Sequence, residues 1–213
     1  MIVNEVPREH VLLVHGLWMN RVAMWPLAWR LRRTGFEVSF FGYYSALQPH
    51  ERHTEKLAEY VAGLPHAVLH LVGHSLGGVL ILNALTQLPQ TKVRSVLALG
   101  SPLRGSTSGL QFMRHALGRF CVGRSGSLWQ TFPVLRVPEG VRVGTIAGTR
   151  RIGLGRFFAS LPGPNDGVVT VAETQLPGLA DHIVLPVSHT GMLISKSVAS
   201  QSIAFLRGGR FDR

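Results

Sequence analysis

Three side chains of this sequence, Ser75, Asp166 and His189, are of the types that together activate a hydroxyl group. A serine hydroxyl is a weak nucleophile at neutral pH. It becomes reactive when an imidazole takes its proton and a third group holds that imidazole in the correct tautomer. A serine activated in this way attacks a carbonyl carbon and becomes acylated. Acyl transfer from a serine is therefore the first chemistry that the sequence suggests.

Ser75 is the candidate nucleophile because of its setting in Gly73-His74-Ser75-Leu76-Gly77. The motif follows an apolar run at residues 67–72 and precedes a helix-like run at residues 76–88. A sharp turn between a strand and a helix lifts a serine hydroxyl clear of the sheet, and small neighbours let the backbone pass. Since short motifs of this kind also arise by chance, the rest of the chain must supply the partners.

His189 is the candidate general base, since it follows the apolar run 183–187 in Ser188-His189-Thr190-Gly191. A loop after the last strand of a parallel sheet lies at the edge where sites form. His182 is the alternative base, but it precedes the same run. We therefore expect His182 at the opposite edge of the sheet.

Asp166 is the candidate acid that orients the base. The chain has three aspartates. Asp181 lies beside His182, and Asp212 lies near the terminus. Asp166 lies in a Gly/Pro turn after the apolar run 141–147, on the side where site loops gather. The alternative is an aspartate that only bonds its own turn backbone. Glu173 is the reserve acid.

Backbone amides would complete such a site by binding the oxyanion that forms during acyl transfer. Where the nucleophile lies on a turn between a strand and a helix, the donors are the amide after the nucleophile and one from a loop after an early strand. The sequence predicts Leu76 and Leu17 for these places, with Trp18 and Met19 as substrate-binding residues. Further apolar residues could line an acyl pocket or simply pack in the core: Met24, Trp25, Phe112, Met113, Phe120, Trp129 and Phe132.

The elements that must position these residues alternate between strand-like and helix-like patterns. Short runs rich in Val, Leu and Ile predict buried strands at residues 11–14, 37–41, 67–72, 93–99, 141–147 and 183–187. Helical patterns lie between or after them at residues 22–34, 51–62, 76–88 and 192–206. The alternation predicts an α/β fold with a mostly parallel six-stranded sheet and helices on both faces. We expect one domain over residues 1–213, with an irregular cap-like insertion at about 101–140.

Composition limits the environment and the partners of the chain. Its 213 residues lack an apolar run long enough to span a bilayer, residues 1–10 lack a signal-peptide pattern, and Cys121 is the only cysteine. We therefore expect a cytoplasmic protein. The net charge is +11, and residues 104–156 carry nine arginines against one acidic residue, Glu139. This segment is either ordinary solvated surface or a contact for an anionic lipid or carrier. No nucleic-acid-binding module is present, and the sequence does not define the oligomeric state.

The motifs together resemble the signatures of α/β-hydrolases, and most closely those of small bacterial lipases and esterases. They are His15-Gly16-Leu17, Gly73-His74-Ser75-Leu76-Gly77-Gly78, Gly100-Ser101-Pro102, Asn165-Asp166-Gly167-Val168-Val169 and Ser188-His189. The resemblance implies a minimal α/β-hydrolase fold that lacks the two leading strands of larger relatives. It also implies acyl-enzyme catalysis without a metal or organic cofactor.

The leading hypothesis is a serine esterase or lipase that acts on a small acyl ester. A thioesterase or acyltransferase would use the same three residues, and the sequence does not separate these activities. A binding protein on a hydrolase fold is the alternative from another class.

Overall fold

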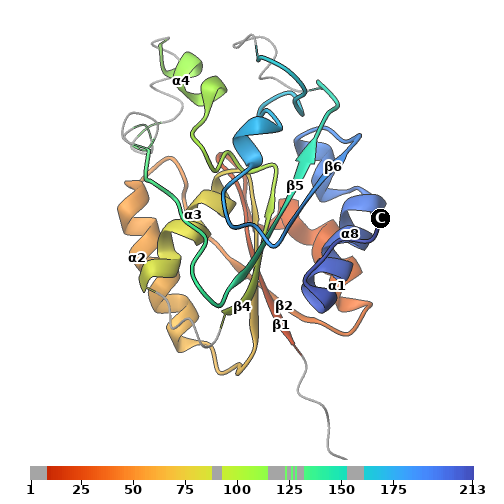
Figure 1. Cartoon of the computed structure of the whole chain (residues 1–213). Coiled ribbons are helices and arrows are strands. Elements are labelled where there is room, and N and C mark those ends of the chain that lie inside the picture. The colour runs from red at the N-terminus through yellow and green to blue at the C-terminus, as the bar shows by residue number, and fades with distance from the viewer. Residues whose placement is uncertain are drawn as a thin grey trace, which may run out of the picture.

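The computed structural model describes residues 9–87, 93–114, 123, 126, 128, 132–152 and 161–213. Six strands form one sheet in the order β2-β1-β3-β4-β5-β6, and every neighbouring pair is parallel. The strands are β1 (His10–Val14), β2 (Glu37–Phe41), β3 (Leu69–His74), β4 (Val93–Leu99), β5 (Arg142–Gly148) and β6 (Asp181–Leu185). The predicted six-stranded parallel sheet is confirmed, and Figure 1 shows it at the centre of the molecule.

Both faces of the central strands β1, β3, β4 and β5 are buried, which explains their apolar runs. Side chains alternate across a strand, so Leu12 and Val14 of β1 belong to one core layer while Val11 and Leu13 belong to the other. Helices α2 (His50–Gly63) and α3 (Leu76–Ala84) cover the first face. Helices α1 (Trp25–Arg32) and α8 (Lys196–Gly208) cover the second, as Figure 1 shows. The prediction of helices on both faces is confirmed.

The ends of several elements differ from the predicted ones, and local chemistry explains the differences. Strand β6 ends at Leu185 because Pro186 has no N–H to donate, so it lies two residues earlier than predicted and includes His182. The predicted helix at 192–206 is divided into the 3₁₀ turn η6 (Thr190–Leu193) and α8, because the hydroxyl of Ser195 caps α8 by accepting from Val198 N. At the far end, Gly209 adopts the left-handed conformation that ends the helix.

Shorter elements complete the chain between the main helices and strands. They are the 3₁₀ turns η1 (Arg21–Met24), η2 (Leu85–Gln87) and η5 (Ala172–Thr174), and helix α4 (Thr107–Met113). Asn20 caps η1, since its side chain accepts from Val22 N. The predicted helix at 76–88 is therefore α3 followed by η2, while Leu88 lies outside the described residues.

Helix α4 lies within the predicted insertion at 101–140 and stands above the sheet in Figure 1. Several residues singled out in the sequence lie outside the described residues: Phe120, Cys121, Trp129, Arg119, Arg124 and Arg156. Among the described residues, no helix is both long enough and apolar enough to cross a lipid bilayer.

Buried histidines predict a marked loss of stability in acid. Burial lowers the pKa of His74 to about 3 and that of His50 to about 4. The unfolded chain binds protons on both residues below about pH 6.5, whereas the folded chain does not. Stability should therefore fall as the pH drops from about 6.5 towards 4, by about 4 kcal/mol for the two residues at pH 5. Urea unfolding at about pH 7.5 and 5 measures this loss.

The variant His50→Leu is the control for this prediction, because leucine fills the buried space without binding a proton. It should reduce the loss between the two pH values by about 2 kcal/mol. An unchanged pH dependence in this variant would show that His50 is not the source.

Candidate active site

The candidate site residues lie at the carboxyl ends of the strands, next to the point where the strand order reverses. Strand β1 has β2 on one side and β3 on the other, so the loops after β1 and β3 leave the sheet side by side. Crevices at such switch points are the usual sites of α/β sheets. Ser75 directly follows β3, Asp166 lies in the segment between β5 and β6, and His189 follows β6.

Ser75 occupies the predicted sharp turn. Its backbone has φ 55° and ψ −123°, and α3 begins at the next residue. Gly77 is required here because a Cβ at this position would overlap the carbonyl oxygen of Val14 in β1. The amide of Ser75 donates to the carbonyl oxygen of Leu99, 2.9 Å away, which ties the turn to the end of β4. The structure therefore holds this serine in a conformation that non-glycine residues rarely adopt.

This conformation predicts that Ser75→Gly is more stable than Ser75→Ala, although both lack the hydroxyl. Alanine keeps the strain of a positive φ, and glycine has none. We expect a difference of about 1 kcal/mol in the free energy of unfolding, measured by urea titration. Equal stabilities would mean that the backbone at this position relaxes when the side chain is changed.

Asp166 and His189 are joined by two hydrogen bonds. The ring Nδ1–H of His189 donates to Oδ2 of Asp166 at 2.8 Å, and the amide of His189 donates to the Asp166 carbonyl oxygen at 3.0 Å. The other carboxylate oxygen, Oδ1, accepts from the amides of Val168 and Val169. Asp166 therefore bonds its own turn, as the alternative reading of the sequence suggested, and holds His189 as well.

The environment of Asp166 favours its charged form. Burial alone would raise the pKa of this fully buried carboxyl group. The charge and hydrogen bond of His189 and the two backbone donors outweigh burial, and together they lower the pKa below its usual value. Asp166 is then ionised at neutral pH. The tautomer it selects places the His189 proton on Nδ1 and a lone pair on Nε2.

His74 links the loop of His189 to the turn of Ser75. It is fully buried, its Nε2–H donates to the carbonyl oxygen of His189 at 3.0 Å, and the two rings lie 4.7 Å apart. Since His74 directly precedes Ser75, this contact brings the base and the candidate nucleophile together. No pattern in the sequence indicates a role for His74, because its partner lies 115 residues away.

The loop after β1 lies against the same turn. A Cβ on Gly16 would lie 2.9 Å from the Cβ of Ser75, so only glycine allows this approach. His15 is buried and stacks on Tyr43, whose hydroxyl donates to the His15 carbonyl oxygen at 2.9 Å. Leu17 therefore follows a loop that is fixed beside Ser75, and Leu76 is the first residue of α3.

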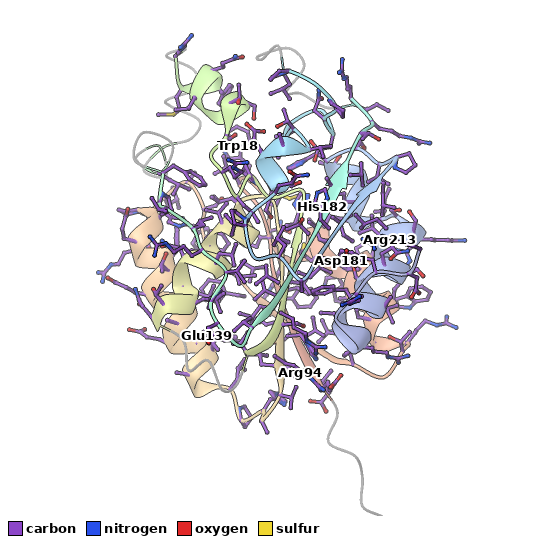
Figure 2. All side chains as sticks on the ribbon, in the orientation of Figure 1. Trp18, Arg94, Glu139, Asp181, His182 and Arg213 are labelled. Carbon is purple, nitrogen blue, oxygen red and sulfur yellow. The ribbon has the colours of Figure 1, made fainter. Side chains whose placement is uncertain are left out.

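The two predicted substrate-binding residues lie in different environments. Trp18 is more than half exposed, has a positive φ of 56°, and makes an edge contact with Phe112 of α4 at 5.6 Å. Figure 2 shows it beneath α4, at the end of the sheet where the site lies. Met19 instead packs against the core layer of α1 and α8. Phe112, Met113 and Phe132 pack against the opposite layer, and Met24 is fully buried.

The alternative residues have structural partners elsewhere. Asp181 begins β6 and accepts from the amides of His182 and Phe211, and Figure 2 shows it near His182 and Arg213. His182 also lies 3.2 Å from the hydroxyl of Thr174. Asp212 is exposed near the end of the chain. Asp181 and His182 are the first two residues of β6 and so lie at its amino end, away from the carboxyl edge of the sheet.

Glu173, the reserve acid, joins α4 to the loop of Asp166. Its two carboxylate oxygens accept from the amides of Thr107 at 2.6 Å and Thr170 at 2.8 Å. Both oxygens are thus engaged by backbone donors at the start of α4 and in its own turn. Among the described acids, Asp166 is the one that His189 contacts.

Residues 11–194 match the model of the Alpha/beta hydrolase family. A search of curated proteins finds 26% identity over 128 residues with the lysosomal thioesterase PPT2-B of Xenopus laevis, a match that covers 55% of this chain and 44% of that protein's length. The mature lipase BlEst2 of Bacillus licheniformis has a similar structure, with a TM-score of 0.72 and 18% identity over 95% of this chain and 94% of the other. The metagenomic carboxyl esterase MGS0156 has a TM-score of 0.65 and 20% identity over 87% and 65% of the two chains.

Proposed function

Because this chain belongs to the alpha/beta hydrolase family, we propose that it hydrolyses carboxylic esters through an acyl-enzyme on Ser75. One observation carries the proposal. His189 is held by an ionised Asp166, and its ring packs on that of His74, the residue before Ser75. The backbone of Ser75 itself has a strained positive φ, as nucleophiles on such turns do. A serine, an imidazole and a carboxylate in this order are suited to acyl transfer.

The first half of the proposed reaction acylates the serine. Nε2 of His189 takes the proton of Ser75 as Oγ bonds to the ester carbonyl carbon, and the negative charge moves to the carbonyl oxygen. The backbone amides of Leu17 and Leu76 stabilise that oxyanion. The tetrahedral intermediate then collapses, His189 gives its proton to the departing alkoxide, and the alcohol leaves.

The second half reverses these roles with water as the nucleophile. His189 takes a proton from water while the hydroxide oxygen bonds to the acyl carbon. Collapse of the second intermediate returns the proton to Ser75 Oγ and releases the carboxylic acid. Asp166 stays ionised throughout and stabilises the imidazolium that forms twice in each cycle. No metal or organic cofactor takes part in this scheme.

The substrate's acyl group is proposed to be apolar. Trp18 and Phe112 approach each other from the loop after β1 and from α4, and both lie on the side of the sheet where Ser75 emerges. Aromatic side chains offer large apolar surfaces to a ligand. An acyl chain is therefore a better match for this side of the site than a small charged acid.

Thioester hydrolysis is the second candidate activity, because the matched curated relative is named a thioesterase. The same residues would act, and a thiolate would leave in place of an alkoxide. The match covers 55% of this chain at 26% identity, so it supports the reaction class more than a particular substrate.

A fluorophosphonate probe followed by peptide mapping tests the proposal directly. The probe reacts with activated serines, so we expect modification of Ser75 in the wild type and none in Ser75→Ala. A panel of p-nitrophenyl esters and acyl thioesters of increasing chain length then separates the two activities. An unlabelled protein that binds the esters without turnover would favour a binding protein on a hydrolase fold.

A further inference from the structure

A second cluster of ligand-type side chains lies at the amino ends of the strands, across the sheet from Ser75. His10 and Glu37 are the first residues of β1 and β2, and the parallel register places them directly opposite each other. His66 comes from the turn between α2 and β3. Three separate segments therefore meet at this edge. Figure 2 shows it at the lower end of the sheet, where Arg94 pairs with Glu9, the residue before His10.

The distances within the cluster are somewhat longer than the spacing around a small cation. Oε2 of Glu37 lies 3.8 Å from Nδ1 of His10 and 3.7 Å from Nδ1 of His66. The potential ligand atoms of the three residues all lie within 4.8 Å of one another. These separations exceed hydrogen-bond length. Ligands about 2.0–2.1 Å from a tetrahedral zinc ion lie about 3.4 Å apart. The two Glu37 distances exceed this spacing by a few tenths of an ångström, and the widest pair exceeds it by at most about 1.4 Å, so His66 and Glu37 must move inward to close the site.

The hydrogen bonding of His10 is that of a metal ligand. Its side chain is buried, with 5% of the residue exposed, and its Nε2 lies 2.7 Å from the hydroxyl of Ser39. When Nε2–H donates to Ser39, Nδ1 keeps a lone pair that faces Glu37. This Nδ1 is buried and has no hydrogen-bond partner. Histidines that bind metals typically donate their other ring N–H to a neighbouring oxygen in the same way.

The other two residues can move to meet an ion. The ring of His66 stacks on that of His10 at 3.9 Å, so it must turn out of this stack before both Nδ1 lone pairs point at one ion. About a quarter of its side chain is exposed. The side chain of Glu37 is nearly half exposed, so its carboxylate can rotate and water can reach the remaining coordination position. Only His10 is fixed by burial, and it already faces the gap.

We propose that His10, Glu37 and His66 form a binding site for a divalent transition-metal ion of the zinc class. Two imidazoles and one carboxylate are ligands that zinc prefers, whereas magnesium and calcium prefer oxygen alone. The ion would join β1, β2 and the turn before β3 at the edge opposite the candidate active site. Its role is to stabilise the fold, since a ligand that binds only the folded state shifts the folding equilibrium towards it.

Calorimetric titration of the tag-free full chain with zinc sulfate, in excess magnesium, tests this site. We expect one zinc per chain that is lost or weakened at least tenfold in His66→Gln and in Glu37→Gln. His182→Gln is the matched control, because His182 also lies at the start of a strand but outside the cluster. Zinc at 100 times its dissociation constant should raise the folding constant of the wild type about 100-fold, and that of His66→Gln far less.

Two results would overturn the proposal. One is zinc binding that is unchanged in the double variant Glu37→Gln/His66→Gln, which would place the ion elsewhere. The other is no binding by the wild type at about 0.1 mM zinc. Both exposed substitutions avoid the buried His10, so loss of folding does not confuse the result, and circular dichroism of each variant checks this. Neither outcome depends on whether the chain hydrolyses esters.

Discussion

His189→Gln is expected to lower kcat for a p-nitrophenyl ester by about 10⁴- to 10⁶-fold. Glutamine has no ring nitrogen that takes a proton near neutral pH, so the hydroxyl of Ser75 would keep its proton. The variant should still fold, because the main-chain bond from residue 189 to the Asp166 carbonyl oxygen does not involve the side chain. Initial rates of ester hydrolysis, corrected for spontaneous hydrolysis, measure the loss.

Combining this change with Ser75→Ala tells whether the two residues act together. Members of one catalytic unit are strongly non-additive, so the double variant should be about as slow as either single variant. His182→Gln is the matched control and should retain nearly full activity. If the losses multiplied instead, Ser75 and His189 would be acting in separate steps, and the proposed reaction would be wrong.

The sheet could be predicted closely because its strands carry their own signals. Strands β2 and β4 have the predicted bounds. Strand β4 is an apolar run buried in the parallel sheet, whereas β2 is a partly exposed strand at the edge of the sheet. The sharp turn at Ser75 also has a local signal, because a serine between glycines at a strand-to-helix junction is typical of a nucleophile. The order of serine, aspartate and histidine then indicated which loops share an edge of the sheet.

Contacts between distant segments left no such signal. The bond from His74 to the His189 carbonyl oxygen depends on how two loops dock, and neither local sequence encodes it. The sequence presents the turn bond and the histidine bond of Asp166 as alternatives, whereas in the structure each carboxylate oxygen fills one of these roles. The predicted end of β6 at residue 187 is wrong, because apolar Val187 extends the pattern past Pro186 while the strand ends at Leu185.

The cluster of His10, Glu37 and His66 was likewise invisible in the sequence. It arises from the register of β1 with β2, which pairs residues 27 positions apart, and from a turn that returns to the same edge. In parallel folds the amino edge of the sheet normally contributes to stability, and the chemistry takes place at the carboxyl edge. The spacing of motifs along the chain therefore indicates the site at the carboxyl edge, whereas the cluster at the amino edge depends on how distant segments pair.

Asp166→Asn is expected to lower kcat by about 10⁴-fold while leaving the fold nearly unchanged. The amides of Val168 and Val169 both donate to Oδ1 of Asp166, so an asparagine here must keep its carbonyl oxygen on that side. Its NH₂ group would then face Nδ1 of His189, where Oδ2 now accepts a hydrogen bond from Nδ1–H. A donor at this position selects the tautomer with the proton on Nε2. That nitrogen could no longer take the proton of Ser75.

The tautomer of the His189 ring distinguishes this effect from a general loss of structure. Nitrogen NMR of labelled protein should show the His189 proton on Nδ1 in the wild type and on Nε2 in Asp166→Asn. Asp166→Ala is the comparison that removes all three accepted hydrogen bonds, and it should cost about 2–4 kcal/mol of stability by leaving buried backbone donors unpaired. If Asp166→Asn is active and the His189 proton is still on Nδ1, the orientation of His189 comes from the loop backbone rather than from the carboxylate.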